Sequence, residues 1–236
     1  SLEVIATNDE EGARFHAGLF TGKVLLGNMQ VSQLKNAYDA DGISIYEAMQ
    51  SFGLKPQEIA EHKRHDLKAF LEVHIEQGPV LEIQKKQLGI VDIIVGIKRV
   101  VVTIDGRADH SGTMPMNMRQ DALEYASKVI SKIGDRARKY KDTVATVGFL
   151  QVEPNIMNII PKKVSFTVDI RSADESALLA QHRGLIEDLE YFSQKLGMKY
   201  SMQDIIDEVP VPMNETLQDI LEKNCLKNKF SFMHLP

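Results

Sequence analysis

The sequence of 236 residues contains one cysteine, no tryptophan, no excess of basic residues and no long hydrophobic run. With Cys225 as the single cysteine, no disulfide can form within the chain, which favours a reducing compartment. Cys225 lies in a helical pattern beside Leu221, which is typical of a small core residue. No apolar run approaches the length that crosses a bilayer, so we expect a soluble, cytoplasmic protein without a membrane partner.

The charge balance is slightly acidic. Lys and Arg number 28 against 33 Asp and Glu, which gives a net charge of −5 at pH 7. Proteins that bind nucleic acid gather their basic residues into a patch that contacts the phosphates, whereas here these residues are scattered among acidic ones. The sequence therefore indicates no nucleic-acid partner.

Both ends of the chain are apolar. Residues 2–6 have strand character, and residues 230–236 form another apolar stretch. Natural termini are usually polar and loosely held. We therefore expect this chain to be a piece of a longer protein.

The first part of the chain alternates between two kinds of hydrophobic pattern. Strand patterns and helical patterns follow one another, with strands expected at residues 2–6, 67–74 and 90–95 and helices at residues 43–52 and 80–86. This alternation is typical of an α/β layer. We expect residues 1–96 and 210–236 to form part of an α/β domain.

After Gly96 the pattern changes to β-α-β-β-α-β, the order of a ferredoxin-like sandwich. The expected strands cover residues 100–105, 143–152, 164–170 and 199–206, and the expected helices cover residues 121–137 and 176–196. We therefore predict an inserted ferredoxin-like domain at residues 97–209, with hinges at Gly96 and at Pro210 and Pro212.

Polar residues follow two of the expected strands, where open α/β sheets place their ligands. One group is His74 in the sequence EVHIEQGP, and the other is Glu10 and Glu11 in NDEEG. Carboxylate and imidazole together are common ligands of Zn²⁺ or Mn²⁺, and a second carboxylate that stays off the metal can act as a general base. Each motif alone is more often explained by a structural histidine or by a solvated acidic turn, and these interpretations stay open.

Three further residues have side chains suited to substrate binding. His110 lies among small residues in ADHSGTMPM, where a loop could hold the imidazole against an oxyanion. Asn158 lies in a loop, and Arg171 ends a strand where its guanidinium could bind a carboxylate. A plain turn, a loop cap and a surface charge explain these residues as well.

Four motifs taken together resemble a known family. The segments NDEEGARF, VHIEQGPVLE, GRADHSGTMPMNMRQDAL and PNIMNIIPKKVSFTVDIRS occur in this order along the chain. They are similar to motifs of the amidase, hydantoinase/carbamoylase branch of the M20 metallopeptidase clan. That branch includes N-carbamoyl-L-amino-acid hydrolases, allantoate amidohydrolases and β-ureidopropionases. The resemblance extends over essentially the whole chain.

The resemblance implies a catalytic domain with two divalent cations, Zn, Mn or Co, and a lid domain that also forms a homodimer. It assigns Glu10 as the general base, and Glu11 and His74 as metal ligands. It implies that His110 stabilises the oxyanion in the neighbouring subunit's site. It also implies that Asn158 and Arg171 bind the substrate, with Arg171 on its carboxylate.

The sequence departs from the family pattern in several places. The family's first metal-binding histidine, its bridging aspartate and its last histidine have no counterpart here, and His234 does not replace them. We therefore expect this chain alone to bind metal weakly and to be inactive. Ile97 and Met114 also differ from the family pattern, which puts substrate contacts near the hinge in doubt. The other histidines match no motif and are expected at the surface: His16, His62, His65 and His182.

The implied activity is metal-dependent hydrolysis of a ureido (N-carbamoyl) C–N bond in an N-carbamoyl-L-amino acid or an allantoate-like substrate. One alternative is an aminoacylase or dipeptidase of the same clan. Another is a fragment without catalytic activity that associates through the inserted domain.

Overall fold

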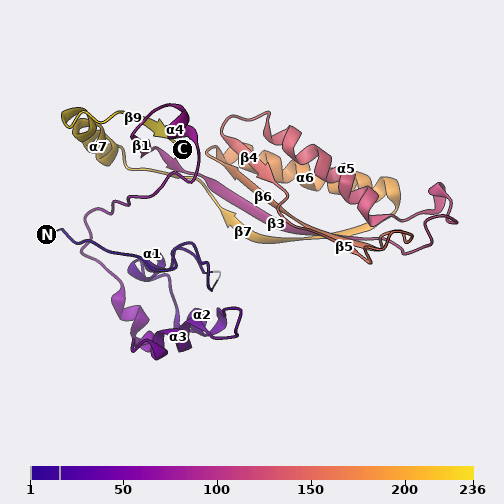
Figure 1. Ribbon diagram of the computed structural model, residues 1–236, viewed down its shortest axis with the longest axis horizontal. Coiled ribbons are helices and arrows are strands. Elements are labelled where there is room, and N and C mark those ends of the chain that lie inside the picture. Colours follow the sequence, from indigo (N-terminus) through magenta and orange to yellow (C-terminus); the bar gives the residue numbers. More distant parts are fainter. Residues whose placement is uncertain (1, 16) are drawn as a thin grey trace. The chain divides into compact units, whose positions relative to one another are not determined.

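The computed structural model describes residues 2–15 and 17–236, which form two compact units divided between His74 and Ile75 (Figure 1). Among the described residues, no helix is both long enough and apolar enough to cross a membrane.

The first unit is built from short helices. They are α1 (Phe20–Leu25), α2 (Val31–Asn36), α3 (Ile45–Ser51) and the 3₁₀ helix η1 (Pro56–His62). Helix α3 confirms the helix expected at residues 43–52, whereas α1 and α2 were not predicted. Helix α3 begins at a capping box in which the Glu47 amide donates to Ser44 Oγ and the Ser44 amide donates to Glu47 Oε2. The helices bury a small apolar cluster of Met29, Leu34, Ile45 and Ile59.

The strands predicted at residues 2–6 and 67–74 are wrong for the described chain, because neither segment lies in a strand. Their apolar side chains are exposed, including Val4 at 92% and Val73 at 102%. A strand exists only through the hydrogen bonds that it makes with a neighbouring strand. Among the described residues, no strand pairs with either segment, so their apolar pattern alone does not produce a sheet.

The second unit contains short elements near the two ends of its sequence. Strand β1 (Leu88–Val91) pairs in parallel with β9 (Phe232–Leu235), and β2 (Ile93–Ile94) pairs antiparallel with β8 (Val211–Pro212). Helix α4 (Val80–Ile83) precedes β1, and helix α7 (Glu215–Lys227) precedes β9. Cys225 on α7 is buried, which confirms that it is a core residue.

A larger sheet dominates the second unit, with helices on one face (Figure 1). Its strands are β3 (Gly96–Asp105), β4 (Thr143–Thr146), β5 (Leu150–Glu153), β6 (Lys163–Ser172) and β7 (Lys199–Glu208). The order is β4-β6-β3-β7, with β5 also paired to β6. Helices α5 (Ala122–Ala137) and α6 (Glu175–Leu196) cover the sheet. The predicted β-α-β-β-α-β order is confirmed, except that the strand expected at residues 143–152 is two strands.

Successive side chains of β6 point to opposite faces of this sheet, so buried and more exposed residues alternate along it. Val164, Phe166 and Val168 are fully buried in the core with residues of β3, α5 and α6. Because successive side chains on a strand point to opposite faces, Asp169 and Arg171 share the face away from that core. This places two charged groups next to each other in a fixed register.

The residues expected as hinges lie against each other where the chain enters and leaves this sheet. A Cβ added to Gly96 would lie 2.7 Å from Pro210 Cδ and 2.8 Å from the Glu208 carbonyl oxygen. Ile97 of β3 pairs with Glu208 of β7 at the same point. The entry and exit of residues 97–209 are therefore adjacent, and only glycine fits at position 96 without displacing its neighbours.

Candidate metal centre and substrate-binding residues

A tight turn positions the acidic residues of the first unit. The Gly12 amide donates to the Asp9 carbonyl at 3.0 Å, and the Leu19 amide donates to the Glu10 carbonyl at 2.8 Å. Gly12 has a φ of +69°, and a Cβ there would lie 2.7 Å from the Gly18 nitrogen. A side chain at position 12 would therefore be strained and would displace the backbone at residues 17–18, next to the Leu19 amide that bonds to Glu10.

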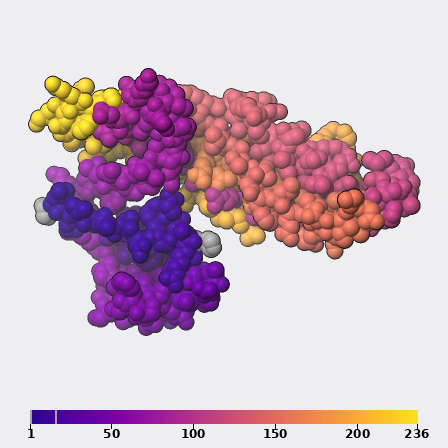
Figure 2. All heavy atoms as spheres, in the orientation of Figure 1, coloured from indigo at the N-terminus to yellow at the C-terminus, as the bar shows by residue number. Residues whose placement is uncertain are grey.

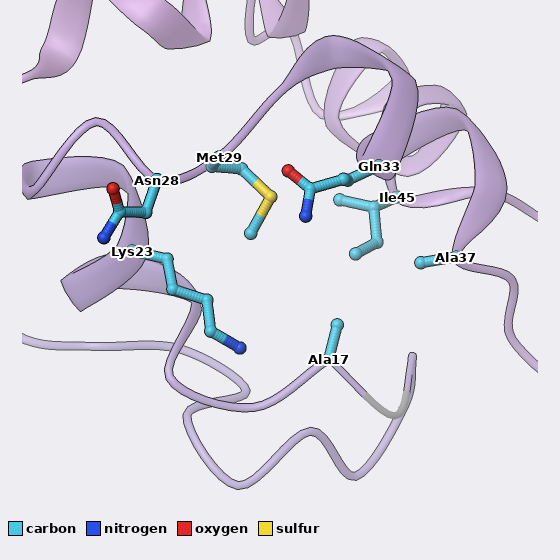
Figure 3. A pocket seen from close by; sticks show the side chains of 7 residues that line it. All are labelled: Ala17, Lys23, Asn28, Met29, Gln33, Ala37 and Ile45. Atoms are coloured by element: carbon cyan, nitrogen blue, oxygen red, sulfur yellow. The ribbon is translucent and has the colours of Figure 1, made fainter. Parts of the chain in front are cut away.

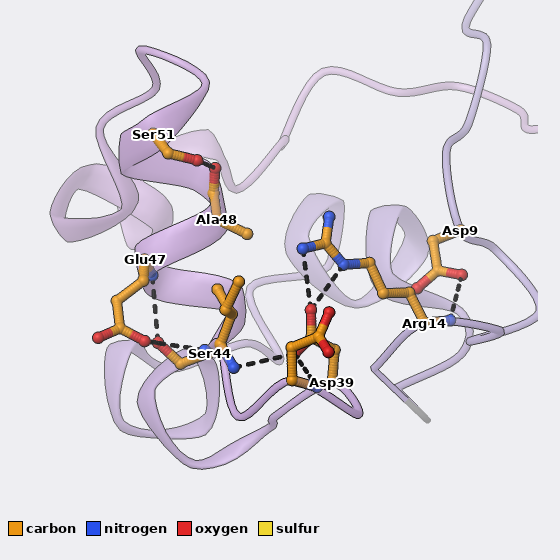
Figure 4. A network of polar contacts seen from close by, with 9 residues as sticks. Asp9, Arg14, Asp39, Ser44, Glu47, Ala48 and Ser51 are labelled. Carbon is orange, nitrogen blue, oxygen red and sulfur yellow. Dashed lines mark hydrogen bonds and ion pairs between the residues drawn. The ribbon is translucent and has the colours of Figure 1, made fainter.

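A polar network connects this turn to the loop before α3 (Figure 4). The Arg14 amide donates to Asp9 Oδ1 at 3.1 Å, and Arg14 Nε donates to Asp39 Oδ2 at 3.0 Å. Asp39 also accepts from the amides of Asp41 and Ile43. The bond from the Ile43 amide, followed by those from Arg14 and Asp41, lowers the pKa of Asp39 below its ordinary value. The acidic turn is thus fixed to the helical part of the unit.

His74 lies next to this turn. His74 Nε2 is 3.6 Å from Glu11 Oε1. One ligand atom each from Glu10, Glu11 and His74 lie within 4.8 Å of one another, and all three side chains are at least partly exposed. The structure therefore brings together the three residues that the sequence indicated as base and metal ligands, although they are far apart in the chain.

The donor set of this group fits a divalent cation. A carboxylate and an imidazole, here Glu11 and His74, are common zinc ligands, and a second carboxylate that stays off the metal, here Glu10, can act as a base. Three side chains do not close the coordination of two cations. The fit is therefore to one ion, with a second ion requiring ligands outside this group.

We expect removal of either ligand to weaken metal binding. Glu11→Gln or His74→Ala should lower the affinity for Zn²⁺ or Mn²⁺ by about tenfold or more, because each removes one of few direct ligands. Isothermal titration calorimetry on this chain measures the effect. Glu61→Gln, an exposed acid in the same unit, is the matched control. Equal affinities for Glu11→Gln and Glu61→Gln would contradict the ligand assignment.

Glu76 of EVHIEQGP bonds to the backbone. Glu76 accepts from the amides of Val80 and Leu81 at 2.7 and 2.9 Å. These amides begin α4 and have no partner within the helix. Glu76 therefore caps α4, while His74 two residues earlier belongs to the acidic group.

A cavity of about 270 Å³ lies elsewhere in the first unit (Figure 3). It is lined by apolar and amide side chains and by Lys23, whose Nζ donates to the Gly18 carbonyl at 2.9 Å. No carboxylate or imidazole of the described residues lines it. The described part of its lining thus offers no carboxylate or imidazole ligand to a metal.

In the second unit, His110 and Asn158 lie on neighbouring loops. The Ser111 amide donates to the Asn158 carbonyl at 3.0 Å, and His110 forms a β-bridge with Ile159. Both side chains are exposed. The segment around residue 110 projects at one end of the unit, as Figure 2 shows. The structure therefore brings these two predicted residues together.

Arg171 does not join them within the unit. It lies at the far end of β6 from Lys163, which follows the Asn158 loop. Arg171 is eight positions further along the strand than Lys163, or about 27 Å at ~3.4 Å per residue. A small substrate that contacts Arg171 therefore cannot also contact His110 of the same chain. It could contact both residue types only if His110 came from a second chain.

The partners of Arg171 were missed by the sequence analysis. Arg171 Nε donates to Asp169 Oδ1 at 2.9 Å, and Arg99 Nε donates to Asp169 Oδ2 at 2.9 Å. Asp169 is half-buried, which raises its pKa, but these guanidinium bonds outweigh the burial and leave the pKa below its ordinary value. The signal was present in the sequence, because Asp169 is two residues from Arg171 on the same strand.

Of the histidines expected at the surface, His62 and His65 are exposed as predicted, and His16 lies outside the described residues. The prediction for His182 is wrong, since its side chain is only 18% exposed and its Nε2 lies 3.3 Å from Asp204 Oδ1. His182 is on α6, and Asp204 is on the strand β7 that this helix covers.

His234 of β9 forms an ionic triad with Asp92 and Glu222. Its Nδ1 lies 2.5 Å from Asp92 Oδ1, and its Nε2 lies 2.7 Å from Glu222 Oε1. The hydrogen bond with Asp92 is the largest cause that raises the pKa of His234, and Glu222 adds to it. The triad connects β9, α7 and the segment after β1.

This triad predicts a pH-dependent stability. Because the folded-state pKa of His234 is raised, its contribution is fully present below the ordinary value of 6.5 and is lost as pH rises through the folded pKa. His234→Gln should therefore destabilise the protein more at pH 6 than at pH 9, by less than about 1 kcal/mol for so exposed a group. Urea unfolding at both pH values measures this. An equal effect at both would contradict the triad's role.

Comparisons with known proteins agree with these features. The peptidase dimerisation domain family matches residues 94–191. The chain is 38% identical to an N-carbamoyl-L-amino-acid amidohydrolase of Paenarthrobacter aurescens, covering 94% of this chain and 55% of the relative. It is 34% identical to an allantoate amidohydrolase of Escherichia coli, covering 98% and 57%. A crystal structure of an amidase of the hydantoinase/carbamoylase family from Burkholderia multivorans superimposes with a TM-score of 0.83 at 28% identity, covering 96% and 55%.

These likenesses define a mixed α/β fold of the M20 type that includes the dimerisation domain. The chain belongs to the hydantoinase/carbamoylase amidohydrolase family, which is metal-dependent. It spans somewhat more than half the length of the curated relatives that it matches.

Proposed function

We propose that this chain is part of an enzyme that hydrolyses the ureido C–N bond of an N-carbamoyl-L-amino acid or an allantoate-like substrate. The observation that carries the proposal is the grouping of Glu10, Glu11 and His74 around one point. The names of its relatives support the substrate class, since they act on N-carbamoyl amino acids and allantoate.

In this proposal Glu11 and His74 hold a divalent cation, Zn, Mn or Co, and other parts of the whole protein complete a two-ion site. When bound, such a cation polarises the substrate carbonyl and makes a water acidic enough to attack near neutral pH. Because this chain supplies only part of the ligands, we expect it to bind metal weakly and to be inactive alone.

Glu10 is the proton carrier of the proposed reaction. Its carboxylate takes the proton from the attacking water and returns it to the leaving nitrogen. His110 donates an N–H bond to the oxyanion of the tetrahedral intermediate. Asn158, which lies beside His110, binds the substrate from the same chain as His110, and the guanidinium of Arg171 of the other chain binds its carboxylate.

The separation of Arg171 from His110 along β6 supports a site shared between two chains. We propose that residues 97–209 form a lid and dimerisation domain, and that residues 1–96 and 210–236 belong to the catalytic domain. In the homodimer, His110 of one chain then reaches the substrate held at the other chain's site. The adjacency of Gly96 and Pro210 gives the lid a narrow connection about which it can close.

A substrate panel tests the activity in the whole protein. N-carbamoyl-L-amino acids, allantoate, N-acyl amino acids and dipeptides are each incubated with the metal-loaded enzyme, and product amine and ammonia are measured. We expect ammonia from the ureido substrates and little turnover of the others. Preference for acyl or peptidyl substrates would instead establish an aminoacylase or dipeptidase of the same clan.

A second candidate is a module that dimerises without catalysis, which the match to a dimerisation domain favours. Strand β7 is at the edge of the larger sheet, and an open edge can pair with another chain. Size-exclusion chromatography with light scattering on this chain, with and without a chelator, measures its mass. A monomer at all concentrations would contradict dimerisation through this unit.

A further inference from the structure

Arg119 bridges two backbone carbonyls of the loop that follows His110. Arg119 Nε donates to the Met114 carbonyl at 3.0 Å, and Arg119 Nη2 donates to the Ser111 carbonyl at 2.6 Å. The two carbonyls are three residues apart, so the guanidinium closes the loop as a bridge. The side chain is partly buried, which favours the planar guanidinium over a hydrated ammonium.

The same loop fixes the chemical form of His110. The Gly112 amide donates to His110 Nδ1 at 3.0 Å. A backbone N–H can only donate, so Nδ1 must be the unprotonated nitrogen and the neutral ring carries its proton on Nε2. A Cβ at Gly112 would lie 3.3 Å from His110 Cε1, so glycine allows the imidazole to lie this close to the backbone.

We propose that Arg119 is a positioning residue that, by closing the 111–118 loop, holds Gly112 against His110 so that the neutral imidazole presents its Nε2–H as a hydrogen-bond donor. Without the bridge, the loop can move, the Gly112 bond is lost and the ring can rotate or change tautomer. This inference rests on the proposed function, in which His110 is the oxyanion donor. Arg119 itself contacts no substrate in this account.

Kinetics of the whole enzyme test the proposal. Arg119→Gln should lower kcat by about tenfold to a hundredfold, the range expected for a misplaced oxyanion donor, with KM changed by less than about twofold. Arg119→Lys should rescue little, because one ammonium cannot bridge both carbonyls. Arg138→Gln is the matched control, since Arg138 makes an exposed ion pair with Asp135 on the same unit. An unchanged kcat for Arg119→Gln would overturn the proposal. A loss of kcat in Arg138→Gln as large as that in Arg119→Gln would also overturn it.

A spectroscopic measurement on this chain is independent of activity. ¹⁵N spectra of the neutral form of His110 should show a protonated Nε2 and an unprotonated Nδ1, and Arg119→Gln or Gly112→Ala should shift these signals toward a mixture of forms. Unchanged signals in both variants would overturn the inference.

The kinetics of two variants distinguish a failure of the proposed role of His110 from a failure of the proposed role of Arg119. If His110→Gln keeps kcat, the proposed role of His110 fails, whereas loss of kcat in His110→Gln but not in Arg119→Gln leaves that role intact and rejects only the role of Arg119.

Discussion

Glu10→Gln in the whole enzyme is expected to lower kcat by roughly 10²–10⁴-fold, the range that a general base contributes. Glutamine has nearly the same shape as glutamate but cannot accept the proton from the attacking water. The Glu10 backbone makes its hydrogen bond to Leu19 whatever the side chain is, so the acidic turn should keep its conformation. Steady-state kinetics on the ureido substrate, with metal content measured on the same samples, give the result.

The control for this variant is the neighbouring Glu11. Glu11→Gln should lower both metal content and kcat, whereas Glu10→Gln should lower kcat while metal content stays near that of the wild type. The two substitutions remove the same chemical group from adjacent residues. If Glu10→Gln keeps most of its kcat with metal bound, Glu10 is not the base.

Arg171→Gln should lower kcat/KM by roughly a hundredfold for a substrate with a free carboxylate. Two charge-assisted hydrogen bonds to a carboxylate together contribute about 3 kcal/mol, and ~1.4 kcal/mol corresponds to a factor of ten. The loss should nearly vanish for the corresponding carboxamide, because the variant no longer discriminates between the two. Kinetics with matched carboxylate and carboxamide substrates measure this directly.

Arg183→Gln provides the control for Arg171, since Arg183 is an exposed arginine of α6 in the same unit. It should leave both substrates unaffected. An equal loss for carboxylate and carboxamide in Arg171→Gln would mean that Arg171 acts through Asp169 and the sheet rather than on the substrate.

The ferredoxin-like part of the fold could be predicted from the sequence because its strands and helices bury their apolar side chains against one another. Val164, Phe166 and Val168 alternate inward on β6, and the matching faces of α5 and α6 lie within the same unit. The spacing of apolar residues in the sequence, every second residue in a strand and every three to four in a helix, indicates such burial directly. Only the break between β4 and β5 was missed, since residues 147–149 continue the apolar composition of a strand although they belong to neither strand.

The strands expected at residues 2–6 and 67–74 could not be predicted correctly, because an apolar strand pattern does not reveal whether a neighbour is present. The grouping of Glu10, Glu11 and His74 was nonetheless correct. It depends on the turn at Gly12 and its anchor through Arg14 to Asp39, rather than on the strand ladders. The Arg99–Asp169 ion pair and the bonds of Arg119 to the His110 loop were not found, because cross-strand ion pairs and backbone carbonyls leave little trace in a pattern of residue types.

Paramagnetic broadening by substoichiometric Mn²⁺ tests the central claim most directly, that the acidic turn and His74 share one cation. The account predicts selective loss of NMR signal at residues 9–12 and at His74 in this chain, abolished by His74→Ala. Broadening that spared His74, or that was strongest at the Asp92, Glu222 and His234 triad, would contradict it.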